Sequence, residues 1–380
     1  MESPVSFYAF VLGAALHRCY LQPDGLVGRE NTILHLVYKK NALRLIHHQI
    51  SSLDKAPSDA LLVAVLIMAA HSQRDFVKPS VPASTSPLAA TQNLDFYGNI
   101  GFTTAHLAAL YVLVEQKGGL ESIKLYGLRD TLSFADILAS TYRLISPKFD
   151  FDIQAVVSMR SQLQPHITSV PVPSCLGFHE LNHDQDCTDL VGVVRFVAEV
   201  VLELDHFAKK RRNAFGLTKI IQLRNAAQHK LLSLAPQVYQ ERGQRSMIYR
   251  ACWYAALIFS DLVLFPLPPA TGVRVRLCDE LRRTISEESL EGWWECCPGT
   301  LTWVLVLGGL GSLSTPHRSW YTTQLRTTSK RLGLTSWEQF GNVVGCYLWW
   351  DYVCDSLAMK LWHDVGEQDS VVFGTPIHAQ

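Results

Sequence analysis

The sequence has 380 residues, of which 48% are apolar and only 18% are charged. This composition supports a large buried core and excludes an intrinsically disordered chain. Its 34 basic and 34 acidic side chains give a formal net charge of zero. The chain therefore lacks the basic excess with which a self-sufficient nucleic-acid-binding protein neutralises phosphates.

Cysteine usage and the apolar segments predict the compartment. Nine cysteines, with Cys296 next to Cys297, do not suggest the disulfide framework of a small secreted protein. The apolar residues 7–16 are preceded by Glu2 and by no Lys or Arg, the reverse of a signal peptide. Apolar runs at 60–70 and 301–313 are shorter than a membrane-spanning helix. We expect an intracellular protein with no membrane contact.

Apolar residues recur at three- and four-residue spacing along most of the chain, which predicts helices. The first clear stripe, in residues 32–50, consists of Ile33, Leu36, Val37, Leu43, Ile46 and Ile50. Pro57 then predicts the end of this helical segment, Ser58 the N-cap of the next helix and Asp59 its acidic first turn. Residues 60–71 are apolar on all sides, which predicts a helix in the centre of the core. The three prolines of residues 78–93 predict a loop.

The same spacing continues to the end of the apolar pattern. It predicts further helices at 103–117, 129–145, 190–212, 218–234, 246–265, 273–286, 300–313, 318–332 and 337–362. Gly118 and Gly119 close the first of these. The proline-rich Pro165 to Gly177 is the clearest internal break, and residues 364–380 read as a flexible tail. The predicted fold is all-α: a single large multi-helix domain over residues 1–363, or two lobes divided near 165–177.

One short motif has the form of a zinc site. His179-Glu180-Leu181-Asn182-His183 matches H-E-x-x-H, in which two histidines one helical turn apart bind zinc and the glutamate is a general base. It follows a proline-rich segment and precedes Asp184-Gln185-Asp186, which predicts a solvated turn. We therefore expect a capping role and assign no catalytic, metal-binding or cofactor-binding residue. A metal-dependent hydrolase acting through His179, Glu180 and His183 is kept as an alternative.

Other residues near this motif do not complete a metal site. Cys175 and Cys187 flank the two histidines, but the sequence contains no C-x-x-C pair. We expect both cysteines to be packed thiols. Gly308-Gly309-Leu310-Gly311 lacks the spacing of a dinucleotide-binding loop, and it predicts close packing between helices.

Two clusters allow both a functional and a structural interpretation. Lys209, Lys210, Arg211 and Arg212 form the densest basic run, which is a candidate nuclear-import signal. It is equally the cationic end of a helix, where the macrodipole favours positive charge. Tryptophans crowd the region from Trp293 to Trp362. Their helical spacing predicts core packing, with an aromatic pocket or partner surface as the other interpretation.

Longer segments share their motifs and their order with one known family. Tyr38 to Ile46 reads Y-K-K-N-A-L-R-L-I, and it is followed by Asp59–Ala70, by His106–Leu120 with its Gly-Gly-Leu end, and by Arg250–Pro269. The pattern continues through Trp294, Pro298–Gly309, Arg318–Tyr321, Ser336–Glu338, Leu348–Asp351, Cys354-Asp355 and Leu361-Trp362. In this order the segments resemble the central regulatory region of fungal-specific transcription factors.

The resemblance implies a helical regulator of transcription in the nucleus, with a biosynthetic (secondary-metabolism) gene cluster as a target. Such regions contact other transcription factors or a second copy, or respond to a small-molecule effector. None of the nine cysteines forms the six-cysteine zinc cluster with which the family reads DNA. We therefore expect contact with DNA only through partners, no cofactor and no enzymatic activity. Two alternatives to a regulator are kept: the metal-dependent hydrolase named above, and a ligand-binding or scaffold protein.

Overall fold

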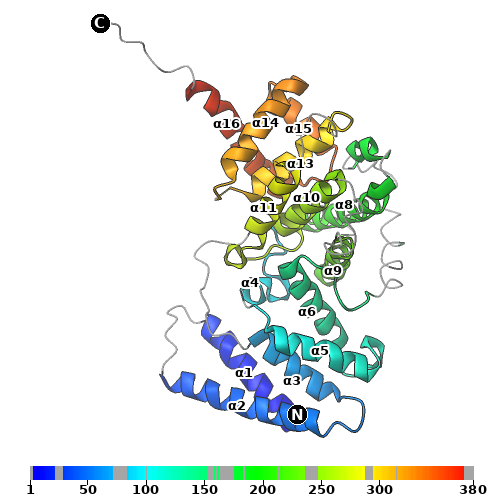
Figure 1. Cartoon of the computed structure of the whole chain (residues 1–380), viewed down its shortest axis with the longest axis vertical. Helices are drawn as coiled ribbons and strands as arrows, with labels where there is room; N and C mark the ends of the chain where they lie inside the picture. The colour runs from blue at the N-terminus through cyan, green and yellow to red at the C-terminus, as the bar shows by residue number, and fades with distance from the viewer. Residues whose placement is uncertain are drawn as a thin grey trace. The chain divides into compact units, whose positions relative to one another are not determined.

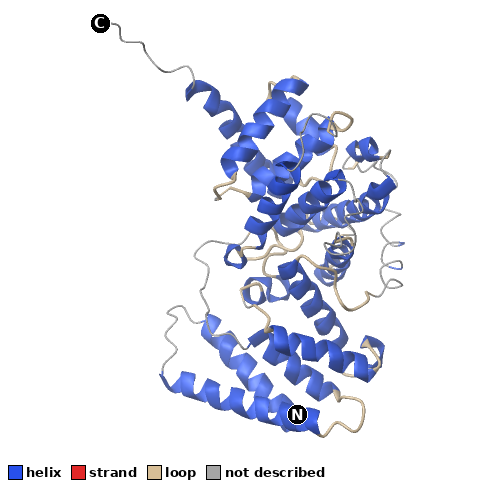
Figure 2. Cartoon of the chain, viewed as in Figure 1, coloured by secondary structure: helices blue, strands red, loops and turns tan. Residues whose placement is uncertain are grey.

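The structure is a computed structural model. It describes residues 3–21, 29–71, 84–99, 101–151, 158, 161, 175–182, 185–211, 214–235, 247–286, 294–313 and 315–371. All regular structure in these residues is helical, and no strand occurs among them (Figure 2). The predicted all-α fold is confirmed. No helix within these ranges is long and apolar enough to cross a bilayer.

Backbone contacts divide the chain into two compact units. Unit 1 comprises Met1–Ala83, Gln92–Arg143 and Pro147–Phe151. Unit 2 comprises Ser84–Thr91, Leu144–Ser146 and Asp152–Gln380. The chain passes between the two units at residues 83–84, 91–92 and 143–152. Most of the proline-rich segment in which the sequence suggests a break, residues 165–174, lies outside the described residues.

Unit 1 is built around one apolar helix. Its helices are α1 (Pro4–Leu21), α2 (Arg29–Ser51), α3 (Asp59–His71), α4 (Leu94–Tyr97), α5 (Thr104–Lys117) and α6 (Leu128–Arg143) (Figure 1). Ten of the 13 residues of α3 are buried, as its all-round apolar sequence predicts. The Ser58 hydroxyl accepts a hydrogen bond from the Leu61 amide at 3.1 Å, so the predicted N-cap is present. Gly118 ends α5 in the left-handed conformation, with φ 96°.

The apolar stripe predicted on α2 is not the side that the core of unit 1 uses. Of its six residues only Ile46 is buried. The buried side of α2 is formed by Ala42 and Ile46, with the partly buried Tyr38 and Leu45 against the same core. Because α2 carries apolar residues on two sides, periodicity alone does not decide which side is buried.

Unit 2 contains the remaining helices. They are α8 (Thr188–Ala208), α9 (Leu217–Ser233), α10 (Met247–Val263), α11 (Val273–Ser286), α13 (Pro298–Gly311), α14 (Arg318–Leu332), α15 (Trp337–Gly345) and α16 (Asp351–Val371). Two of them, α10 and α13, are buried along nearly their whole length. The short 3₁₀ turn η3 (Gly177–Leu181) precedes α8.

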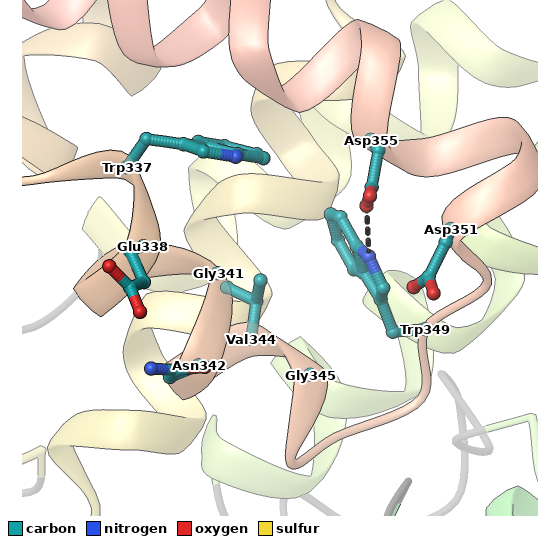
Figure 3. Close-up of a pocket in the computed structure, with 9 residues that line it drawn as sticks. All are labelled: Trp337, Glu338, Gly341, Asn342, Val344, Gly345, Trp349, Asp351 and Asp355. Atoms are coloured by element: carbon teal, nitrogen blue, oxygen red, sulfur yellow. Dashed lines mark hydrogen bonds between the residues drawn. The ribbon is translucent and has the colours of Figure 1, made fainter.

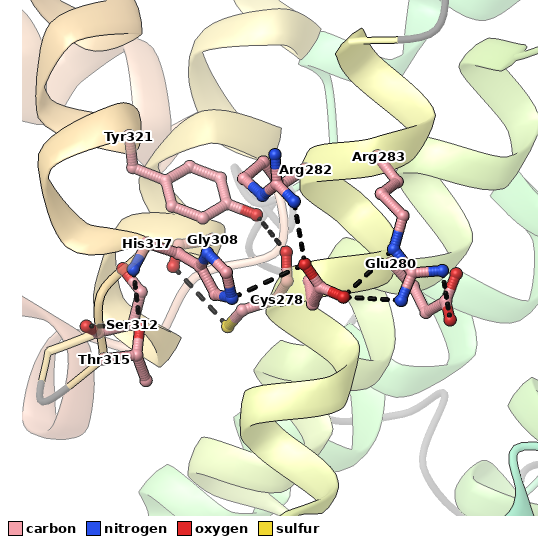
Figure 4. Close-up of polar contacts among 10 residues, drawn as sticks. Cys278, Glu280, Arg282, Arg283, Gly308, Ser312, Thr315, His317 and Tyr321 are labelled. Carbon is pink, nitrogen blue, oxygen red and sulfur yellow. Dashed lines mark hydrogen bonds and ion pairs between the residues drawn. The ribbon is translucent and has the colours of Figure 1, made fainter.

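The glycines of α13 allow its neighbours to approach its backbone. A Cβ atom at Gly308 would overlap the ring of Tyr321 on α14. The hydroxyl of that tyrosine donates to the Cys278 carbonyl of α11 at 2.7 Å, and the Cys278 thiol lies 3.6 Å from the Gly308 carbonyl (Figure 4). Gly309 and Gly311 meet Leu361 and Cys278 in the same way. The predicted role of this glycine run in helix packing is therefore confirmed.

The C-terminal region differs from the prediction in two ways. The single helix predicted at 337–362 is two helices, α15 and α16, separated by Cys346–Trp350. Residues 364–371, predicted as part of a flexible tail, belong to α16. Asp364 accepts two hydrogen bonds from Arg318 of α14, at 3.0 and 2.6 Å, and Val365 is buried. These contacts stabilise α16 past Trp362, where the predicted helix ends.

Candidate functional site

The turn between α15 and α16 is made by contacts with distant segments. The Cys346 carbonyl accepts hydrogen bonds from the backbone amides of Cys175 and Gly177, both at 2.9 Å. The indole of Trp303 donates to the Leu348 carbonyl at 3.0 Å. These carbonyls would otherwise bond within one continuous helix, so the contacts stabilise the break between α15 and α16. The break turns Trp349 inward, where it is 7% exposed.

An open cleft of about 290 Å³ lies between α15 and α16 (Figure 3). Three carboxylates and two indoles line it, together with small residues and one amide: Trp337, Glu338, Gly341, Asn342, Val344, Gly345, Trp349, Asp351 and Asp355. The Trp349 indole donates to the Asp355 carboxylate at 2.8 Å, which orients both side chains at the wall of the cleft.

The electrostatics of the cleft favour a positively charged ligand. Burial, and next the charge of Asp355, raise the pKa of Asp351 above its ordinary value. A bound cation would relieve the repulsion between these carboxylates and could also lie on an indole face. The lining residues supply carboxylates and indole faces, which are groups that bind a cation.

The sequence did not single out the acidic residues of this cleft. The sequence predicts Trp337 and Trp349 mainly in the core, with a pocket as the other interpretation. The structure gives tryptophans both roles, because Trp294 and Trp303 are fully buried whereas Trp337 is half-exposed at the cleft. Trp293 lies outside the described residues. The i, i+4 spacing of Asp351 and Asp355 beside a tryptophan pair is the signal that points to the site.

The candidate import signal lies directly after α8. Lys209 caps the end of that helix and forms an ion pair with Asp205 at 2.8 Å. Lys210 has a positive φ of 50°, so the chain leaves the helical path there, and both Lys210 and Arg211 are exposed. Arg212 lies outside the described residues. The described part of the run therefore lies at a helix end and is exposed, so its position agrees with both interpretations.

A fourfold replacement separates the two interpretations of this run. If the run is an import signal, changing Lys209, Lys210, Arg211 and Arg212 to Ala should move a fluorescently tagged protein out of the nucleus. The melting temperature should change little, because an ion pair at the surface whose lysine is exposed, such as Lys209–Asp205, contributes about 0–1 kcal/mol. The matched control is Lys330→Ala/Arg331→Ala, at an exposed helix end. An unchanged nuclear signal would leave only the helix-terminal role.

The H-E-x-x-H segment is a 3₁₀ turn in its described part, not an α-helix. The Glu180 carboxylate accepts hydrogen bonds from the Thr300 amide at 2.9 Å, the Thr300 hydroxyl at 2.8 Å and the Tyr347 hydroxyl at 2.9 Å. Glu180 therefore caps the N-terminus of α13, where the helix macrodipole also favours a negative charge. His179 is exposed, and His183 lies outside the described residues.

The cysteines beside this segment are packed thiols. Cys175 and Cys187 are buried and form no disulfide. Burial raises the pKa of Cys175 to about 12, which keeps its thiol protonated and unreactive at neutral pH. Within the described ranges, no three His, Cys, Asp or Glu side chains are grouped so that they could hold a metal ion.

Comparison with known proteins identifies no family for this chain. No protein-family model, curated protein or solved structure matches the chain. The resemblance to fungal-specific transcription factors therefore stays a hypothesis based on the motifs and their order.

Proposed function

We propose that this chain is a transcriptional regulator of fungal type, which works in the nucleus through partner proteins. The observation that carries the proposal is the cleft between α15 and α16, because its carboxylates and indoles suit recognition of a cationic ligand. The ordered motifs of the sequence support the link to transcription. A cationic effector is the ligand that this cleft fits best.

A tethering experiment tests the regulatory role. The full chain is fused to a heterologous sequence-specific DNA-binding domain, and transcription is measured from a reporter that carries the matching site. We expect reporter transcription to change several-fold relative to the DNA-binding domain alone. Trp337→Ala and Glu338→Gln should weaken the change, because they remove an aromatic face and a charge from the cleft.

The matched control for the charge change is Glu115→Gln, at an exposed position of α5 in unit 1. This variant should behave as the unaltered chain does. If tethering leaves transcription unchanged although the fusion is folded and nuclear, the regulatory proposal is wrong.

A ligand-binding protein without a role in transcription is the second candidate, and the same cleft favours it. Calorimetric titration of the purified chain with small organic amines distinguishes the two. Amine binding that depends on Glu338, together with a silent tethered reporter, would support this second candidate.

A further inference from the structure

The outward side of α2 is apolar and follows a coiled-coil repeat. Along this side the residues at alternating three- and four-residue steps are Ile33, Leu36, Lys40, Leu43, His47 and Ile50, and all six are exposed. In heptad terms, Leu36, Leu43 and Ile50 occupy the d positions, and Ile33, Lys40 and His47 occupy the a positions. We call these six residues the α2 seam.

The four apolar residues of the α2 seam are all exposed. Ile33, Leu36, Leu43 and Ile50 are between 37% and 55% exposed. The helix is held from its other side, through Ala42 and Ile46, so the seam is free of the core of unit 1. Contiguous apolar patches of a few hundred Å² on a folded protein commonly mark sites of interaction.

The charged side chains that α2 itself places beside the seam are all basic. Lys39 and Arg44 occupy the g and e positions that flank it, and Lys40 lies within it. No Asp or Glu occurs between Ile33 and Ser51 in the sequence. A partner that covers the apolar residues must therefore bring negative charge to both edges.

This charge pattern argues against pairing of α2 with a second copy of itself. In a parallel pair, the g position Lys39 of one copy lies next to the e position Arg44 of the other. In an antiparallel pair, e positions face e positions and g positions face g positions, and no e or g position between Ile33 and Ser51 is acidic. Neither arrangement therefore offers an ion pair at the edge where coiled coils place them, and the parallel one sets like charges against each other.

The pattern also differs from that of a helix that lies in a lipid surface. Such a helix buries an uninterrupted apolar side and keeps its basic residues at the margin. Here Lys40 and His47 lie inside the seam, between the d-position residues. A polar residue at an a position is a feature of helix pairing, in which it defines the register.

We propose that the α2 seam binds an acidic amphipathic helix of another protein, which packs its own apolar stripe on Leu36, Leu43 and Ile50 and sets Glu or Asp side chains opposite Lys39, Lys40 and Arg44. The inference rests on α2 alone and does not depend on the regulatory function proposed above.

A designed peptide tests this binding mode on the full chain. The probe is a fluorescently labelled helix of three heptads with Leu at every d position, Ile at every a position and Glu at every e and g position. We expect anisotropy titration to give a dissociation constant of about 1–10 μM. A matched peptide with Lys at every e and g position should bind at least about tenfold more weakly.

Variants of α2 identify the surface. Leu36→Ser/Leu43→Ser should weaken binding of the Glu peptide by about tenfold or more, while helicity and melting temperature stay unchanged because both side chains are exposed. The control is Leu34→Ser, since Leu34 is 51% exposed but lies off the seam. Lys40→Glu/Arg44→Glu should reverse the preference toward the Lys peptide.

Three results would overturn the proposal. The first is equal binding of the Glu and Lys peptides, or equal loss of binding in Leu34→Ser. The second is a dimer of the unaltered chain, seen by light scattering, that Leu36→Ser/Leu43→Ser dissociates. The third is absence of peptide binding together with seam-dependent binding to phosphatidylcholine vesicles containing about 30% phosphatidylserine.

Discussion

Replacing Gly308 by Ala should lower the free energy of unfolding by about 2–3 kcal/mol, the usual cost of overpacking a dense core with some loss of hydrogen bonding. The new methyl group would overlap the ring of Tyr321, which is fully buried. To make room, α14 must shift away from α13, and the bond from the tyrosine hydroxyl to the Cys278 carbonyl lengthens or breaks. Urea unfolding followed by circular dichroism measures the loss.

Gly192→Ala is the matched control, because it makes the same change on α8 where a Cβ atom meets nothing within 4 Å. We expect this variant to be more stable by about 0.5–1 kcal/mol, since Ala is the better helix former. The double variant Gly308→Ala/Tyr321→Leu should be less destabilised than the sum of its two single changes. Equal stability of Gly308→Ala and the unaltered chain would contradict the close packing of α13 and α14.

Replacing Glu180 by Ala should lower the free energy of unfolding by about 2–4 kcal/mol. The change leaves the Thr300 amide and hydroxyl and the Tyr347 hydroxyl without their acceptor, and Thr300 is fully buried. Burial, together with the charge of Glu180, raises the pKa of Tyr347, so this phenol stays protonated and continues to need an acceptor. Glu180→Gln keeps one acceptor oxygen and should lose only about 1 kcal/mol.

The controls for Glu180 are changes to the two histidines of the same motif. His179→Ala should change stability by less than about 0.5 kcal/mol, because His179 is exposed. His183→Ala should leave stability and metal content nearly unchanged. About one zinc ion per chain that disappears in His183→Ala would instead support the metal-dependent hydrolase.

Several helix boundaries could be predicted from the sequence because their signals are local. The helices α11 and α14 begin and end at the predicted residues. Ser58 caps α3, and Gly118 closes α5, through contacts with residues three or four positions away. A helix buries a stripe of side chains with a period near 3.6 residues, and its ends need capping groups. Both features lie within the helix or next to it in the sequence, so they can be recognised without the rest of the fold.

The break between α15 and α16 could not be predicted in this way. The sequence from Trp337 to Trp362 keeps its helical spacing through the break. The turn forms because Cys175, Gly177 and Trp303 donate hydrogen bonds to backbone carbonyls of Cys346 and Leu348. The donors lie more than 40 residues away along the chain, and the cleft that depends on this turn was therefore missed.

The amino-acid sequence alone predicts a helical protein and the positions of most of its helices. The buried side of α2 and the helix that Glu180 caps follow from the folded structure instead. Helix formation depends on side-chain periodicity and on capping groups within a few residues of each other. The choice between two apolar sides of a helix, or between two hydrogen-bond partners, depends on the shape and polarity of segments that meet only when the chain is folded.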